Sequence, residues 1–271
     1  MRIMIGTLSK AFDLSDEALR FYEKKGLVRP KREGETGYRV YERVDIQRIG
    51  NIKRMKNQGF TLEEINSVYT GMSEAQLRAL YHRKAAEMCR NIVYSQHVFE
   101  HMQEALNVLQ CASELINVPQ SVSYDTVYAL EYSSIEEMWE RLPCDPQRKD
   151  LLRQIPLVSY TTFINKEALF GAPPVVRKGL FISDRDADVL GIDRSLFRCI
   201  DAHRAVSCLF RLENGAFPIE SLLKRLSAFC QERSLTPADD IFTVQLVNFV
   251  DPDSRAVHYA RMVVPLAQHA V

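Results

Sequence analysis

The chain has 271 residues, and its 35 basic residues balance 35 acidic ones. This length allows two domains with cores of their own. The six cysteines show no CxxC motif or paired spacing, so we expect no disulfides. No signal peptide is present, and no apolar run could span a membrane. We therefore expect a cytoplasmic protein that makes no membrane contact.

The positive charge is concentrated near the N-terminus. Residues 20–56 contain 12 basic and 5 acidic residues, while the chain as a whole is neutral. A basic block in an otherwise acidic protein predicts a polyanionic partner for that block.

The first elements predict a helix-turn-helix. A short helix is expected over residues 7–12 and a tight turn over 13–15. A second helix is expected over 16–25, with Ser15 as its N-cap and Gly26 as its end. In this motif the second helix enters the major groove of DNA.

A wing and two more helices are expected next. The alternating segments 27–30 and 38–41 flank a polar turn at 32–37, which predicts a β-hairpin. A third helix is expected over 45–58. Thr61 and Glu64 form a capping box for a fourth helix that ends at Tyr69.

The stretch 73–117 has no Gly or Pro and predicts one helix roughly 60 Å long, too long to be buried in its own subunit. Seven-residue repeats indicate a coiled coil between two copies, parallel or antiparallel. The alternative is a helix packed on its own domain. The repeats form two series and a flank: Leu77, Lys84, Asn91, Val98 and Ala105; Tyr81, Met88, Ser95, Met102 and Leu109; and Ala85, Ile92, Phe99 and Leu106.

The C-terminal block predicts strand, helix, strand, strand, and then the same order again. The expected strands are 122–132, 157–164, 175–182, 197–202, 204–212, 241–249 and 257–265. The expected helices are 134–142, 147–155 and 217–233. We therefore expect an α+β fold.

Four motifs resemble the MerR family of transcriptional regulators. They are Leu19-Arg20-Phe21-Tyr22-Glu23, Gly26-Leu27-Val28-Arg29-Pro30, Gly37-Tyr38-Arg39-Val40-Tyr41 and Gly59-Phe60-Thr61-Leu62-Glu63-Glu64-Ile65. The resemblance implies a winged-helix DNA-binding domain at 1–72 and an antiparallel dimerisation helix at 73–117. It also implies a homodimer that binds double-stranded promoter DNA together with RNA polymerase.

The same resemblance implies the residues that would contact DNA. Arg20 and Tyr22 would lie on the recognition helix, Tyr38 and Arg39 on the wing, and Lys56 near the end of the third helix. Arg and Lys neutralise phosphate, and a Tyr hydroxyl can donate to it.

Residues 120–271 resemble the GyrI-like effector-binding domain of the multidrug-sensing MerR branch, through Asp251-Pro252 and Arg261-Met262-Val263-Val264-Pro265-Leu266. The resemblance implies a duplicated β-α-β-β arrangement around an aromatic groove. The candidate ligand-binding residues are Trp139, Tyr160, Phe163, Gln245, Tyr259 and Glu131. The final two strands carry no carboxylate, so we expect a lipophilic aromatic effector bound with little selectivity for positive charge.

By resemblance, effector binding would activate transcription by distorting the promoter spacer. Two alternatives stay open: a metal-responsive regulator that uses Cys111, and a weak ligand-hydrolysing GyrI-like enzyme. No nucleophile motif, phosphate loop or metal-ligand spacing is apparent, so we expect no enzymatic activity, no catalytic residues and no cofactor.

Overall fold

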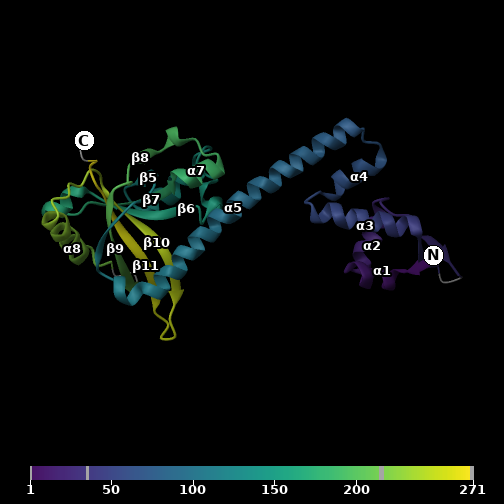
Figure 1. Ribbon diagram of the computed structural model, residues 1–271, viewed down its shortest axis with the longest axis horizontal. Helices are drawn as coiled ribbons and strands as arrows, with labels where there is room; N and C mark the ends of the chain where they lie inside the picture. The colour runs from purple at the N-terminus through teal and green to yellow at the C-terminus, as the bar shows by residue number, and fades with distance from the viewer. Residues whose placement is uncertain (1, 35–36, 214–216, 269–271) are drawn as a thin grey trace. The chain divides into compact units, whose positions relative to one another are not determined.

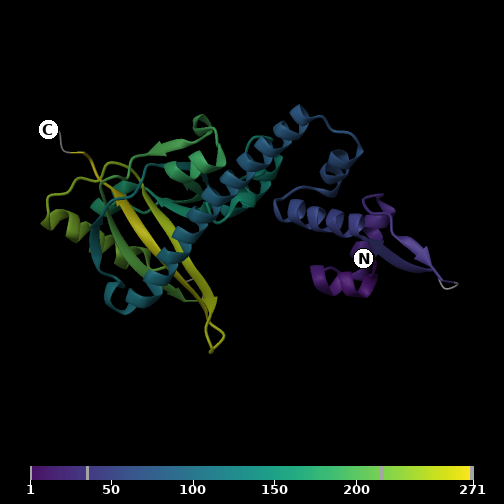
Figure 2. The same ribbon diagram turned by 45° about the vertical axis from the view of Figure 1, so that its right-hand side comes forward.

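The computed structural model describes residues 2–34, 37–213 and 217–268. It has the α+β architecture that the sequence predicts (Figures 1 and 2). The chain forms two compact units, Met1–Ile92 and Val93–Val271, and each is described by itself. The long helix α5 (Glu74–Leu115) contributes residues to both.

The N-terminal unit is a winged helix-turn-helix. Its helices are α1 (Ile5–Phe12), α2 (Asp16–Lys24), α3 (Arg43–Asn57) and α4 (Leu62–Thr70). A small sheet of order β1-β3-β2 is built from β1 (Arg2–Met4), β2 (Lys31–Glu33) and β3 (Tyr38–Glu42). The wing begins four residues later than expected. Leu27 and Val28 are both buried, and neighbouring residues of a strand cannot both point to one core.

The helix starts follow local hydrogen bonds. The Ser15 hydroxyl accepts from the Ala18 amide, as predicted. Thr61 and Glu64 exchange both bonds of a capping box, and so do Ser73 and Gln76 at the start of α5. These bonds satisfy amides that have no partner within the helix, so short sequence patterns predict them well.

The C-terminal unit contains the predicted duplication. The first half is β5 (Val127–Tyr132), α6 (Ile135–Arg141), β6 (Val158–Ile164) and β7 (Val176–Ser183). The second is β9 (Ala205–Glu213), α8 (Ile219–Glu232), β10 (Ile241–Val250) and β11 (Ala256–Pro265). One antiparallel sheet of order β4-β9-β11-β10-β6-β7-β5-β8 joins the halves at β10 and β6.

Some short elements differ from expectation. The strand expected over 122–132 is split into β4 (Pro119–Val122) and β5. The helix expected over 147–155 is a 3-10 turn, η2 (Leu151–Gln154). The pattern did not predict the helix α7 (Asp184–Leu190). The strand β8 (Arg198–Ile200) is shorter than expected. The remaining 3-10 turns are η1 (Leu142–Cys144), η3 (Lys166–Phe170) and η4 (Arg194–Leu196).

The two faces of this sheet differ in what covers them. On one face α8 packs over residues that include Phe210 and Met262, and α6 packs over residues that include Leu180. Alternate residues point the other way, so Phe163 and Phe181 belong to the opposite face. That second face is the one that the end of α5 approaches.

The backbone ladder between β6 and β10 is short. It pairs only Ile241 with Ile164 and Phe242 with Phe163. Beyond it the Thr161 hydroxyl donates to the Thr243 carbonyl oxygen at 2.8 Å, and the Thr243 hydroxyl accepts from the Thr162 amide at 2.9 Å. Side chains therefore continue the junction between the halves where the ladder ends.

One of the two apolar stripes of α5 is exposed to solvent. Val108 and Ala112 are buried, whereas Met102 is 60% exposed and Phe99 57%. The exposed side follows a strict alternation of four- and three-residue steps: Tyr81, Ala85, Met88, Ile92, Ser95, Phe99, Met102, Leu106 and Leu109. Val98 and Ala105 of the other predicted series face the sheet within the C-terminal unit. No helix among the described residues is both long and apolar enough to cross a membrane.

Candidate functional site

The exposed face of α2 is basic with one aromatic ring. Arg20, Phe21 and Lys24 are exposed on it, and Lys25 follows at its end. Phe21 is 43% exposed, and the Lys25 ammonium lies 5.5 Å from its ring centre. A basic helix surface that also presents an apolar ring can contact both phosphates and base edges in the major groove.

Ion pairs connect the wing to α2. The Glu23 carboxylate accepts from Arg39 Nε at 2.6 Å and from Arg32 Nη2 at 3.1 Å. Burial by itself would raise the pKa of Glu23, but the hydrogen bonds from Arg39 and Arg32 outweigh it and lower the pKa. The carboxylate therefore stays ionised and holds the wing against the recognition helix.

The predicted DNA-contacting residues fall into two groups. Arg20, Tyr38 and Lys56 are exposed, and Arg39 is half-buried in its pair with Glu23. Tyr22, in contrast, is only 6% exposed and belongs to the core of the unit, where burial raises its pKa. Tyr22 is buried because three residues after Leu19 the helix again faces inward, so it is less accessible to DNA than Arg20. The pattern missed Phe21 and Lys24 as surface residues.

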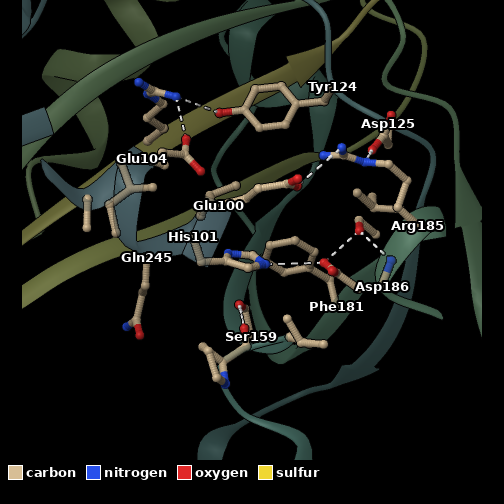
Figure 3. A pocket seen from close by; sticks show the side chains of 18 of the residues that line it. Glu100, His101, Glu104, Tyr124, Asp125, Ser159, Phe181, Arg185, Asp186 and Gln245 are labelled. Atoms are coloured by element: carbon tan, nitrogen blue, oxygen red, sulfur yellow. Dashed lines mark hydrogen bonds and ion pairs between the residues drawn. The ribbon is translucent and has the colours of Figure 1, made fainter. Parts of the chain in front are cut away.

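A cavity of about 590 Å³ lies in the C-terminal unit between α5 and the second face of the sheet (Figure 3). Val98, Met102 and Ala105 of α5 form one wall. The opposite wall contains Phe181 and Val244. Ser159, Gln245 and Leu246 line it where β6 and β10 are no longer paired through their backbones.

Paired charges surround this apolar space. Arg261 donates to the Glu104 carboxylate at 2.8 Å and to the Tyr124 hydroxyl at 3.3 Å. Arg185 pairs with Asp125 at 2.6 Å and with Glu100 at 3.5 Å. Figure 3 shows Glu100 and Glu104 of α5, Arg185 of α7, and Tyr124 and Asp125 of the segment after β4 converging at this site.

Burial shapes the ionisation of these groups. Burial would lower the pKa of Arg261, but Tyr124 and Glu104 raise it overall. Burial raises the pKa of Tyr124. At neutral pH the cavity therefore holds a charged guanidinium beside a neutral phenol.

One of the six predicted ligand-binding residues, Gln245, lines this cavity. Phe163 is fully buried beneath the sheet face, and Tyr259 stacks on Phe249 with ring centres 6.3 Å apart. Glu131 is bound by Arg177 and Arg198.

Trp139 and Tyr160 lie together on the other face of the sheet. Their ring centres are 6.4 Å apart, and Tyr160 packs with the cluster under α6. The structure therefore brings neither ring to the cavity. The lining residues that the pattern missed include Phe181 and Val244 of the sheet as well as residues of α5 and α7. No local signal indicates which distant helix will cover a sheet.

Cys111, the candidate for a metal ligand, is exposed on α5. Within residues 2–34, 37–213 and 217–268, no group of three or more His, Cys, Asp or Glu side chains is placed to hold a metal ion. Cys111 therefore belongs to no cluster of three or more such side chains among these residues of one chain.

Comparison with known proteins identifies the N-terminal unit. The profile described as "MerR HTH family regulatory protein" matches residues 3–72. The mercuric resistance operon regulatory protein of Bacillus cereus is 36% identical over 83 residues, which are 30% of this chain and 63% of that protein. The regulator CueR of Escherichia coli O6:H1 is 31% identical over 106 residues, which are 39% of this chain and 76% of CueR. This chain belongs to the MerR family.

As a MerR-family member the chain is a DNA-binding transcriptional regulator with a helix-turn-helix domain. The match to CueR covers 39% of this MerR-family chain, so it leaves most of the C-terminal unit unmatched.

Two solved structures are similar to larger parts of the chain. One is the EcmrR–DNA complex studied by cryo-electron microscopy, at 15% identity and a TM-score of 0.36, covering 98% of this chain and all of that one. The other is described as a hydrolase from Listeria innocua, at 10% identity and a TM-score of 0.37, covering 59% of this chain and 98% of that one. At these TM-scores neither likeness bears on what the C-terminal unit does.

Proposed function

We propose that this MerR-family regulator is an effector-responsive activator. Two copies bind promoter DNA, and a lipophilic aromatic molecule in the C-terminal cavity shifts the dimer to the state that distorts the promoter for RNA polymerase. The functional parts are a DNA-binding domain at 1–72, a dimerisation helix at 73–117 and an effector-binding domain at 120–271. The protein acts in the cytoplasm and carries out no catalysis.

One observation carries this proposal: α5 is itself a wall of the cavity. Val98 and Ala105 line the space, and Met102 lies at its edge, while the other side of the same helix presents the exposed apolar stripe through Phe99 and Leu106. A ligand that packs against the inner wall therefore acts on the element expected to join the two copies. A ligand shifts a conformational equilibrium only if it binds one state better. Its contact with α5 supplies that difference when the two states of the dimer place this helix differently against the sheet.

The chemistry of the cavity supports an aromatic effector with little selectivity for charge. The final two strands carry no carboxylate, but other elements bring four to the cavity, Glu100, Glu104, Asp125 and Asp186. Each of them has an arginine or histidine partner. A cationic ligand would have to compete with a resident guanidinium, whereas a neutral ring buries apolar surface without breaking an ion pair.

The test is isothermal titration calorimetry with neutral and quaternary-ammonium aromatics of matched size, chosen from a thermal-shift screen. We expect the two ligand types to bind within about tenfold of each other, which is about 1.4 kcal/mol. Ala105→Phe should abolish binding by filling the cavity. Trp139 fluorescence is an unsuitable reporter because the ring lies on the other sheet face.

The matched control is Ala228→Phe, which puts the same ring into a second hollow between α8 and η3. It should leave binding unchanged. Equal loss of binding in both variants would show that the ligand does not occupy the proposed cavity. A cation bound more than tenfold tighter would overturn the effector class, and Glu104→Gln and Glu131→Gln would then locate the responsible carboxylate.

A further inference from the structure

Asp186 is a buried carboxylate at the first turn of α7, on the edge of the cavity. The residue is 5% exposed. Its Oδ2 accepts from the Ser183 hydroxyl at 2.7 Å. Its two oxygens also meet two histidines of α5, with His97 Nδ1 at 2.8 Å from Oδ1 and His101 Nε2 at 3.3 Å from Oδ2. A carboxylate so far from water depends on these partners for its charge.

The two histidines are four residues apart and so project from successive turns of one face of α5. Each uses a different oxygen of Asp186, so one side chain of α7 is bonded to two turns of α5. His101 and Asp186 also line the cavity, and Figure 3 shows them facing each other there. Asp186 therefore bonds two turns of α5, and one of these two bonds, the one to His101, lies at the ligand space.

We infer that Asp186, His97 and His101 form a proton-dependent latch that positions the cavity-lining turns of α5 against α7. A protonated His101 makes a charge-assisted hydrogen bond to Asp186, and a neutral imidazole makes a weaker one. Asp186 and His97 are positioning residues, and His101 is the group whose charge sets the strength of the latch.

The surrounding charges agree with this assignment. The hydrogen bond from His101 to Asp186 raises the pKa of His101, burial opposes it, Glu104 of α5 adds to the rise and Arg185 of α7 reduces it. Burial would raise the pKa of Asp186, but its bonds to His101, Ser183 and His97 lower it. Asp186 thus stays ionised over the range in which His101 titrates.

The bond between His101 and Asp186 is expected to weaken as the pH rises. A histidine whose folded pKa is raised contributes stabilisation that is complete below its ordinary pKa of about 6.5 and is lost as the pH rises through the raised value. The latch is therefore tighter at pH 6 than at pH 8. Because Asp186 has a lowered pKa, its own protonation does not interfere in this window.

The use of the latch in regulation rests on the proposed effector cavity. A neutral ligand beside His101 excludes water and so disfavours the imidazolium form. By linkage, ligand and proton then oppose each other. We expect the neutral fluorescent probe N-phenyl-1-naphthylamine to bind about fivefold more tightly at pH 8 than at pH 6, at the low end of measured couplings.

The first experiment needs no ligand and no DNA. The full chain is labelled at histidine, and the histidine side chains are titrated with pH by NMR. Amide hydrogen exchange of residues 97–105 is then measured at pH 6 and pH 8 and corrected for the intrinsic exchange rates. We expect His101 to titrate above the ordinary range and these amides to be more protected at pH 6. In Asp186→Asn and in His101→Gln the pH dependence of protection should disappear.

The control is His258→Gln. His258 makes a similar 2.8 Å bond from Nδ1, to the neutral Asn248 side chain, and does not line the cavity. It should behave as the unsubstituted chain. If circular dichroism shows Asp186→Asn to be misfolded, His101→Gln alone decides, because it keeps a hydrogen-bond donor and loses only the titration.

The outcomes separate the two proposals. An ordinary titration of His101, or protection that is equal at both pH values, overturns the latch. If the latch shows the expected pH dependence but the chain binds no probe, the effector cavity is refuted and the latch is confirmed. Probe affinity that is equal at pH 6 and pH 8, with the latch confirmed, overturns its role in regulation.

Discussion

At Gly179 two strands approach so closely that only a glycine fits. A Cβ built on Gly179 would lie 1.9 Å from the Leu130 carbonyl oxygen and 3.0 Å from the Phe163 ring. Backbone cannot yield as a flexible side chain does. The residue belongs to β7, where it pairs with β5 beside the core.

We predict that Gly179→Ala destabilises the C-terminal unit by about 2–3 kcal/mol, the cost of forcing strands apart in a packed core. Urea denaturation followed by Trp139 fluorescence measures this, because the single tryptophan lies in α6 of that unit. Gly50→Ala is the control: its Cβ would make only an ordinary 3.5 Å contact with Phe12. An unchanged Trp139 transition in Gly179→Ala would contradict the prediction.

The second residue-scale prediction concerns DNA. Arg20→Ala should weaken binding to the selected operator by about 1–3 kcal/mol if Arg20 contacts a base, and Lys56→Ala should mainly reduce the salt slope by about one. Tyr22→Phe should leave affinity unchanged, because Tyr22 is a core residue. Fluorescence anisotropy at two salt concentrations distinguishes these effects. A large loss in Tyr22→Phe with Arg20→Ala unaffected would reverse the assignment.

At the scale of the element, α5 has two sides with different partners. The side through His101 and Val108 faces its own unit, and the stripe through Met88 and Phe99 is exposed, with Met102 of this stripe also reaching the edge of the cavity. A long apolar stripe with three- and four-residue steps fits a second copy of the same helix. Part of the helix packs on its own domain, and the opposite side remains exposed for the proposed dimer.

We predict that the double substitution Met88→Asp and Met102→Asp yields monomers, because it places charges in the dimer seam. Multi-angle light scattering measures the mass. Ala86→Asp introduces the same charge on an exposed position away from the stripe and should leave the dimer intact. A dimer that persists in the double variant rules out this seam.

At the scale of the whole molecule, the proposal is that effector binding favours a dimer state that holds distorted DNA. Bending and untwisting a promoter costs on the order of a few kcal/mol, which contacts in the bent state can offset. Effector should therefore activate transcription from a promoter whose −35 and −10 elements are too far apart for polymerase. In vitro transcription on a series of spacer lengths tests this, and equal activation at ordinary spacing would contradict it.

The sequence by itself determined the features that depend on neighbours along the chain. Ser15, Thr61 and Ser73 cap the helices that the pattern predicts, because capping bonds reach only three residues. The helix-turn-helix motifs and the repeat of strand, helix, strand, strand were visible for the same reason. So was the heptad pattern of α5, since helical periodicity is local.

Only the tertiary structure decided which surfaces meet. It placed Trp139 and Tyr160 on the sheet face away from the cavity, buried Tyr22, and turned Val98 and Ala105 inward while leaving Phe99 exposed. It also brought Asp186 to His97 and His101 across 85 or more residues of sequence. Such pairings depend on strand register and on which helix covers which sheet face. Those are set by packing the whole core at once, and no short segment encodes them.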